Sequence, residues 1–179
     1  MAIIRINKLE AAQRQIDAAI RIFFGGEDPV AVHSVAAAGF RILRDLAEKN
    51  HTQVWQMIDA CIRPGMKKKF WSGEGVNKVA NFLKHADKDS DQTLDNIDEI
   101  INDVTLFFAC VLYQDLGYEY TPEMRFFVTW YSCIHPDQIR DDLPGKAQLL
   151  EASKYWRDLP RNQQLEFGKE ALEQIRQQN

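Results

Sequence analysis

Acidic side chains recur at short intervals between residues 87 and 98, the first three at alternate positions, and this spacing suits the binding of a calcium ion. Calcium takes six to eight hard oxygen ligands, which carboxylates in a tight loop can supply. The predicted ligands are Asp87, Asp89, Asp91, Asp95 and Asp98. The alternative is a solvated acidic connector, in which Asp95 and Asp98 favour the positive end of the helix that follows.

The same aspartates occupy positions 1, 3, 5, 9 and 12 of an EF-hand frame, and Leu94 fills its apolar position 8. Two positions depart from that frame. Gln92 stands where a glycine makes the sharp turn, and Asp98 stands where a glutamate binds through both oxygens. The sequence contains no second loop of this kind, although EF-hands normally occur in pairs.

Arg44-Asp45, followed by His51, forms an Arg-x6-His pattern at the end of a predicted helix. A histidine can move the proton of an attacking hydroxyl, and an arginine can stabilise the charge that develops on a phosphoryl group. The pattern resembles that of the HEPN superfamily of small all-helical domains. The resemblance implies a metal-independent ribonuclease that works as a homodimer, with Arg44 and His51 as catalytic residues. The alternative for His51 is a helix end, where an imidazole favours the negative dipole.

Lys84 and His85 are a second candidate catalytic pair, at the end of the helix predicted for residues 76–86. Lys78, Asn81 and His85 fall on nearly one face of that helix. The segment Lys-His-Ala-Asp, residues 84–87, also resembles a family of uncharacterised bacterial helical proteins. That resemblance runs over most of the chain and implies no known activity.

Lys67, Lys68 and Lys69 form a basic run directly before Phe70 and Trp71. Cations beside aromatic rings can bind RNA or another anionic ligand, the cations through phosphates and the rings by stacking on bases. Lys78 and Lys84 would extend this surface if the two segments lie close together. The alternative is a solvated turn whose aromatic rings pack inward.

Composition limits the classes of protein to which the chain can belong. A chain of 179 residues suits one domain, residues 1–179, and its net charge of -4 argues against a broadly basic surface for duplex nucleic acid. We expect a cytoplasmic protein without membrane contact, because no apolar run approaches a bilayer span and no signal peptide is recognised. The three cysteines are expected to be reduced and buried. Nucleotide and acyl-transfer motifs are missing from the sequence, and no cofactor is predicted.

Apolar spacing predicts helices throughout and no strands, hence an all-α single-domain bundle of about seven or eight helices. Thr52 is expected to cap the third helix, and the most apolar helix is expected to begin at Leu94. The predicted helices span residues 8–24, 29–49, 52–62, 76–86, 94–116, 122–134, 146–158 and 161–177.

His33 lies among apolar residues of the second helix, so we expect a buried, hydrogen-bonded histidine rather than a catalytic one. The segment 126–131 is apolar nearly all round, which indicates neighbours on every side of its helix. The leading hypothesis is therefore a non-catalytic binding module that acts as a homodimer, with the HEPN-like ribonuclease and calcium binding as alternatives.

Overall fold

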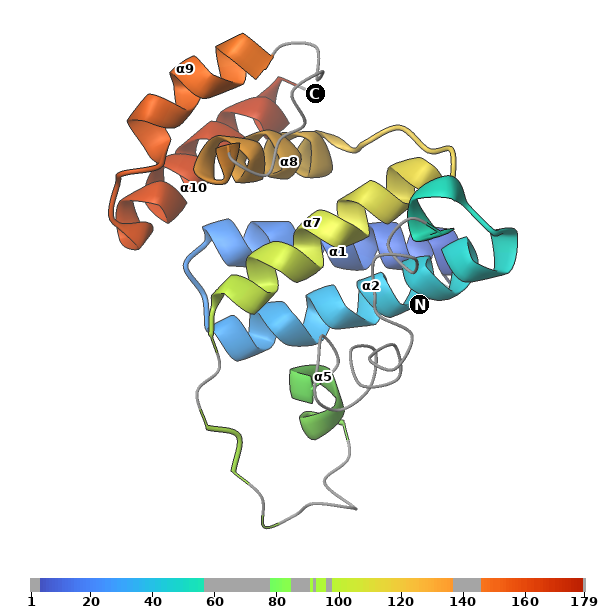
Figure 1. Cartoon of the computed structure of the whole chain (residues 1–179). Coiled ribbons are helices and arrows are strands. Elements are labelled where there is room, and N and C mark those ends of the chain that lie inside the picture. Colours follow the sequence, from blue (N-terminus) through green and yellow to red (C-terminus); the bar gives the residue numbers. More distant parts are fainter. Residues whose placement is uncertain are drawn as a thin grey trace.

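The computed structural model describes residues 4–56, 78–84, 91, 93–95, 98–136 and 146–178. Residues 53–56 form a short helical turn, and no strand occurs in these ranges, so the predicted all-α fold is confirmed. The helices with defined bounds are α1 (Lys8–Phe24), α2 (Pro29–Asn50), α5 (Lys78–Phe82), α7 (Ile100–Asp115), α8 (Pro122–Ile134), α9 (Lys146–Trp156) and α10 (Arg161–Gln177) (Figure 1). None of the helices in the described ranges combines the length and the apolar character that crossing a membrane requires.

Capping side chains set the helix starts. The Asn7 side chain accepts from the Glu10 amide while the Glu10 carboxylate accepts from the Asn7 amide, which closes a capping box on α1. Asp28 caps α2 with Pro29 as its first residue, as predicted. Thr121 caps α8, also as predicted. Each cap satisfies amides that the first helical turn leaves without an intrahelical partner.

Helices α1 and α2 pack side by side, and a small residue permits their close approach. A Cβ atom on Gly39 of α2 would lie 2.8 Å from Ile16 Cδ1 of α1, so a larger residue would force a shift. Helix α7 packs on α2 and α1, α8 packs on α1, and α9 and α10 both pack on α8. Helix α5 packs on α2, on the side of the bundle away from α9 and α10 (Figure 1).

The apolar surface of α8 is covered largely from within the chain. Phe127 and Trp130 lie edge-on to Phe23 of α1, with ring centroids 5.6 and 5.4 Å apart. Helices α9 and α10 cover further sides, and only Arg125 and Thr129 of α8 are exposed. The neighbours that the sequence pattern predicts for this helix are therefore supplied by the same chain.

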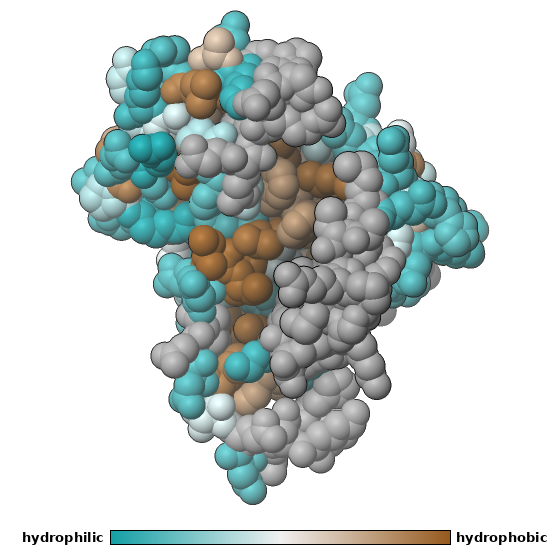
Figure 2. All heavy atoms as spheres, viewed as in Figure 1, coloured by the Kyte–Doolittle hydropathy of each residue, from teal (hydrophilic) through white to brown (hydrophobic). Residues whose placement is uncertain are grey.

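Helix α7 begins at Ile100, so the predicted start at Leu94 is wrong. The Asp98 carboxylate accepts from the Ile100 amide at 3.0 Å, and such local side-chain bonds favour a turn over a continued helix. The face bearing Val104 and Phe108 is only half-buried. Figure 2 shows apolar side chains gathered in the middle of the viewed face, where Figure 1 places α7. The fully buried face of α7 instead includes three polar residues, namely Asn102, Asp103 and Thr105.

Thr52 does not cap the helical turn that follows it, which corrects a second prediction. The Asp115 carboxylate at the end of α7 accepts from the amides of Val54 and Trp55, at 3.1 and 3.2 Å. A carboxylate is the stronger acceptor for a helix N-terminus because it carries a full charge. The buried Thr52 hydroxyl is left without a hydrogen-bond partner in the described part of the chain.

Candidate functional site

The predicted Arg44 and His51 lie at the C-terminal half of α2 and are not joined by a hydrogen bond. The Arg44 guanidinium donates through Nε and Nη2 to Asp45 Oδ1, at 3.1 and 2.7 Å. His51 is exposed, closes α2, and has a left-handed backbone with φ of 50°. Six residues stand between the two, which places them about 10 Å apart along the helix axis.

Several predicted residues lie outside the described ranges: Lys67, Lys68, Lys69, His85, Asp87 and Asp89. Of the others, Lys78, Lys84, Asp91, Asp95 and Asp98 are exposed. The described residues include no group of three or more His, Cys, Asp or Glu placed to hold a metal ion. Calcium binding by the 87–98 loop therefore stays a prediction.

Arg41 of α2 and Lys84 after α5 bring two positive charges near each other. Partial burial, and then the nearby Arg41 guanidinium, lower the pKa of Lys84. Neither side chain forms an ion pair with a described carboxylate, so an anion bound between them would be stabilised. Lys84 belongs to the predicted anion surface and Arg41 was not predicted, and binding of an anion there stays a prediction.

His33 is fully buried and hydrogen-bonded, as predicted. Its Nδ1 lies 3.0 Å from Asn102 Oδ1, while Asn102 Nδ2 donates to the Pro29 carbonyl at 3.0 Å. This arrangement assigns the ring proton to Nδ1, which donates to the amide oxygen. Burial lowers the pKa of His33, and the hydrogen bond that its ring donates to Asn102 opposes that shift. The imidazole is therefore a neutral link between α2 and α7.

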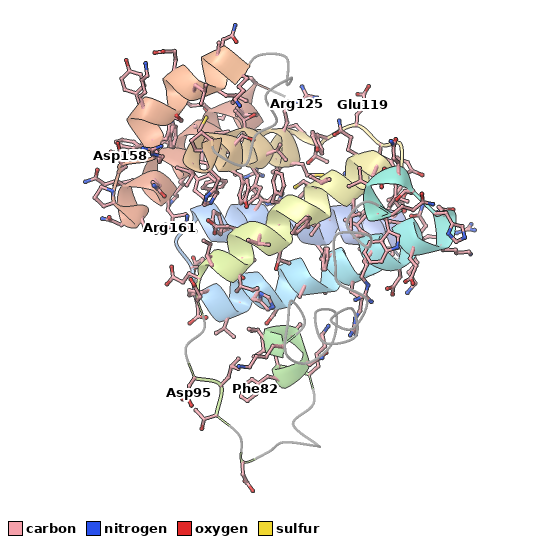
Figure 3. All side chains as sticks on the ribbon, viewed as in Figure 1. Phe82, Asp95, Glu119, Arg125, Asp158 and Arg161 are labelled. Atoms are coloured by element: carbon pink, nitrogen blue, oxygen red, sulfur yellow. The ribbon has the colours of Figure 1, made fainter. Side chains whose placement is uncertain are left out.

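Asp103 of α7 and Arg161, the first residue of α10, form the most buried ion pair in the described residues. Arg161 Nη2 lies 2.5 Å from Asp103 Oδ1, and Nη1 lies 3.0 Å from Oδ2. The Asp103 side chain is 3% exposed and that of Arg161 is 33% exposed. The guanidinium also lies 5.0 Å from the Phe23 ring centre and 5.3 Å from that of Trp130. This two-pronged pair fastens α10 to α7 and to the aromatic core. Figure 3 labels Arg161, which begins α10.

A cavity of about 270 Å³ lies beside this pair, between the start of α7 and the end of α8. His135 lines it, and its buried Nε2 atom has no hydrogen-bond partner among the described residues. Burial lowers the pKa of His135, the Asp103 carboxylate raises it, and Arg161 lowers it again. Burial likewise raises the pKa of Asp103, against the hydrogen bonds from Arg161.

This cluster has a structural role, because Arg161 binds Asp103 through both terminal nitrogens and so joins α10 to α7. Each of those nitrogens carries a second N–H, so the guanidinium keeps donors for a further acceptor. Sequence reasoning missed Asp103 and Arg161. The available signal was a charged residue inside the most apolar helix, because such a residue needs a partner.

Two buried thiols offer little nucleophilic chemistry. Burial raises the pKa of Cys110 far above its usual range and also raises that of Cys133, so both are protonated at neutral pH. Their buried, free state is the one predicted. The third cysteine, Cys61, lies outside the described residues.

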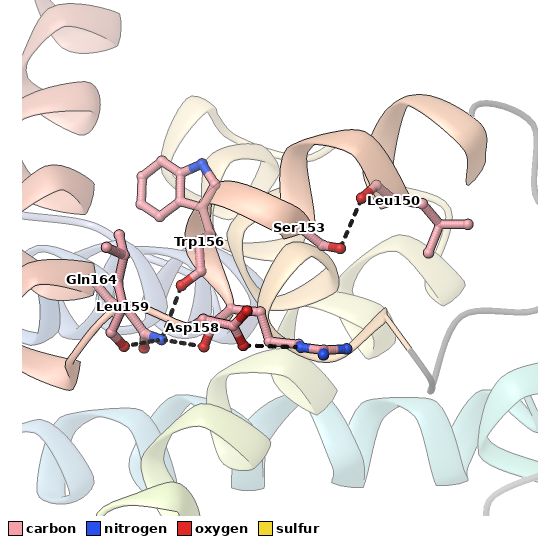
Figure 4. A network of polar contacts seen from close by, with 7 residues as sticks. Leu150, Ser153, Trp156, Asp158, Leu159 and Gln164 are labelled. Carbon is pink, nitrogen blue, oxygen red and sulfur yellow. Dashed lines mark hydrogen bonds and ion pairs between the residues drawn. The ribbon is translucent and has the colours of Figure 1, made fainter.

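The C-terminal hairpin, which consists of α9, the turn 157–160 and α10, presents apolar side chains to solvent. Tyr155 is 77% exposed, Phe167 47% and Leu150 39%. The buried Gln164 amide donates to the carbonyls of Trp156, Arg157 and Leu159, which ties α10 to the end of α9 (Figure 4). The hairpin is therefore held together by these hydrogen bonds and exposes aromatic rings to solvent.

Comparison with protein-family models, with curated proteins and with solved structures found no match to this chain.

Proposed function

We propose that the protein is a non-catalytic binding module that acts as a homodimer through its C-terminal hairpin. The observation that carries the proposal is the exposure of Tyr155, Phe167 and Leu150 on a braced pair of helices. Aromatic side chains supply a large contact area and are enriched at protein interfaces. The ionic groups of the described core, in contrast, are engaged with one another.

Charge on the hairpin permits a second copy of this chain as the partner. Around Tyr155, Lys154 is paired with Glu151 and Arg157 with Asp158, so this surface is neutral. On α10, Glu166 and Glu170 outnumber Lys169 around Phe167. In a two-fold arrangement, α9 of one protomer faces α10 of the other, so the acidic surface around Phe167 meets a neutral surface rather than another acidic one.

Charge substitutions on the hairpin test this interface. Tyr155→Glu and Phe167→Glu should convert a dimer to a monomer in light scattering after gel filtration, because each puts a carboxylate into the apolar centre. Ile4→Glu is the matched control, since Ile4 is 70% exposed but lies outside the hairpin. Unchanged circular dichroism melting would show that the fold is intact. A dimer that survives both hairpin substitutions would place the interface elsewhere.

Cleavage of RNA stays the alternative prediction, from Arg44 and His51. A single-stranded RNA incubated with the protein and EDTA should stay intact if the protein is a binding module without catalytic activity. Cleavage in EDTA that Arg44→Ala and His51→Ala abolish, and that Arg14→Ala preserves, would favour the ribonuclease instead. Arg14 is an exposed arginine of α1 and serves as the matched control.

A further inference from the structure

A cavity of about 520 Å³ lies where the start of α1 meets the ends of α2 and α7. It is larger than the cavity beside Arg161, and none of the predicted site residues lines it. The lining residues are Asn7, Lys8, Leu9, Leu46, Asn50, Thr52, Asp115, Leu116 and Tyr118.

One side of this cavity is positive. The capping box occupies the amides of Asn7 and Glu10, and leaves those of Lys8 and Leu9 without a partner in the described chain. The α1 dipole is positive at this end, and the Lys8 side chain adds a full charge without an ion pair to any described carboxylate. This side therefore suits a carboxylate.

The opposite side is negative. Leu46 and Asn50 belong to the last turns of α2, and Asp115 is the last residue of α7, so two helix C-termini meet here. The Asp115 carboxylate accepts from two backbone amides. A carboxylate has about four acceptor sites, so Asp115 can accept further donors. This side therefore suits an ammonium group.

The walls between the two sides are apolar, with one orphaned polar group. Leu9, Leu46 and Leu116 are half-buried, and Tyr118 presents a ring that is 46% exposed. Thr52 lines the same cavity, and its buried hydroxyl oxygen has no hydrogen-bond partner in the described ranges. Because this oxygen is closed to solvent, the charges of the two sides, rather than this hydroxyl, indicate the ligand.

We propose that this cavity binds a small zwitterion of the amino-acid class, free or as a short peptide. Its carboxylate lies at the start of α1 beside Lys8, and its ammonium lies at Asp115 and the ends of α2 and α7. An apolar side chain of the ligand packs on the three leucines. The proposal is independent of the dimer, because no residue of the C-terminal hairpin lines the cavity.

Thermal melting of the full chain with four probes tests the ligand class. A ligand that binds only the folded state raises the melting temperature. L-Leucine or leucyl-leucine at about 10 mM should raise it, since a ligand present at ten times its Kd or more gives a measurable shift. L-Leucinamide, which lacks the carboxylate, and 4-methylpentanoate, which lacks the ammonium, should not. A shift with the dipeptide alone would identify a peptide ligand, and one with leucine alone a free amino acid. No shift with either zwitterion, or equal shifts with all four probes, would overturn the proposal.

Two variants test the site itself by calorimetric titration with the zwitterion that shifts the melting temperature. Lys8→Ala should weaken binding by about tenfold, the effect of losing one good ion pair, whereas Thr52→Val, which removes a hydroxyl closed to solvent, should leave the affinity unchanged. Lys49→Ala is the matched control, because Lys49 is an exposed lysine of the last α2 turn that does not line the cavity. Thr52→Val should leave the melting temperature of the unliganded protein unchanged or higher, since its hydroxyl has no partner. Unaltered affinity in Lys8→Ala would contradict the assignment.

Discussion

Replacing Arg161 by methionine should destabilise the protein strongly at neutral pH, because it leaves the Asp103 carboxylate buried and uncompensated. Methionine keeps the helix propensity and most of the aliphatic stem. Breaking a buried ion pair by removing one partner costs about 3–5 kcal/mol. Because the Arg161 side chain is one-third exposed, water screens part of the pair, and we expect a loss near the lower end, about 3 kcal/mol.

The loss of stability in Arg161→Met should also depend on pH, and the burial of Asp103 determines the direction of that dependence. Burial raises the pKa of Asp103 above its ordinary 3.8, and removing Arg161 raises it further. A raised folded-state pKa gives stability that is present below pH 3.8 and is lost as pH rises through the folded value. His135 acts in the same direction, since removing Arg161 takes away one cause of its lowered pKa. Arg161→Met should therefore cost less stability near pH 4.5 than near pH 7.5.

Urea unfolding followed by circular dichroism at both pH values measures these differences. Arg157→Met is the matched control: its pair with Asp158 spans 3.5 Å, and its side chain is 53% exposed, so it should cost under about 0.5 kcal/mol at either pH. A loss in Arg161→Met that is equal at the two pH values, or no larger than that of the control, would refute the reasoning.

Three further outcomes are expected. Gly168→Ala should lower stability by about 1–3 kcal/mol in urea unfolding, despite the better helix propensity of alanine, because a Cβ atom there would overlap the buried ring of Phe24. Equal or higher stability would show that the ring can move. Thr121→Ala should cost about 1–2 kcal/mol by the same assay, because it removes the cap of α8 and a 2.6 Å hydrogen bond to the buried Asp17; a loss below the error of the fit would count against the cap. Calcium at 1 mM should add about 2.7 kcal/mol of stability if the 87–98 loop binds with a Kd of ~10 μM. An unchanged melting temperature would exclude calcium binding by this loop with that affinity.

The starts of α2 and α8 were predictable because their signals are local. Asp28 and Thr121 cap the helices that follow them in the chain, so the residues that set these boundaries lie within one turn of each other. The start of α7 was misplaced because Leu94 continues the apolar spacing, whereas the Asp98 side chain bonds locally and holds the chain in a turn. The spacing of apolar residues alone carries no information about such a hydrogen bond.

The buried polar contacts were not predictable, because their partners are distant in sequence. Arg161 binds Asp103 from 58 positions away, and Asn102 binds His33 from 69 positions away. For His33, apolar neighbours in the sequence were enough to predict burial, but no local feature of the sequence identifies its hydrogen-bond partner. Asp115 is a similar case: it caps the turn at residues 53–56 from another helix and so displaces Thr52 from that role.

Sedimentation velocity of the unmodified protein at micromolar concentration tests the central claim most directly. A homodimer built on the C-terminal hairpin predicts a species of twice the 20.7 kDa chain mass, with a dimer fraction that rises with concentration. A single species at the mass of one chain over the whole micromolar range would contradict it.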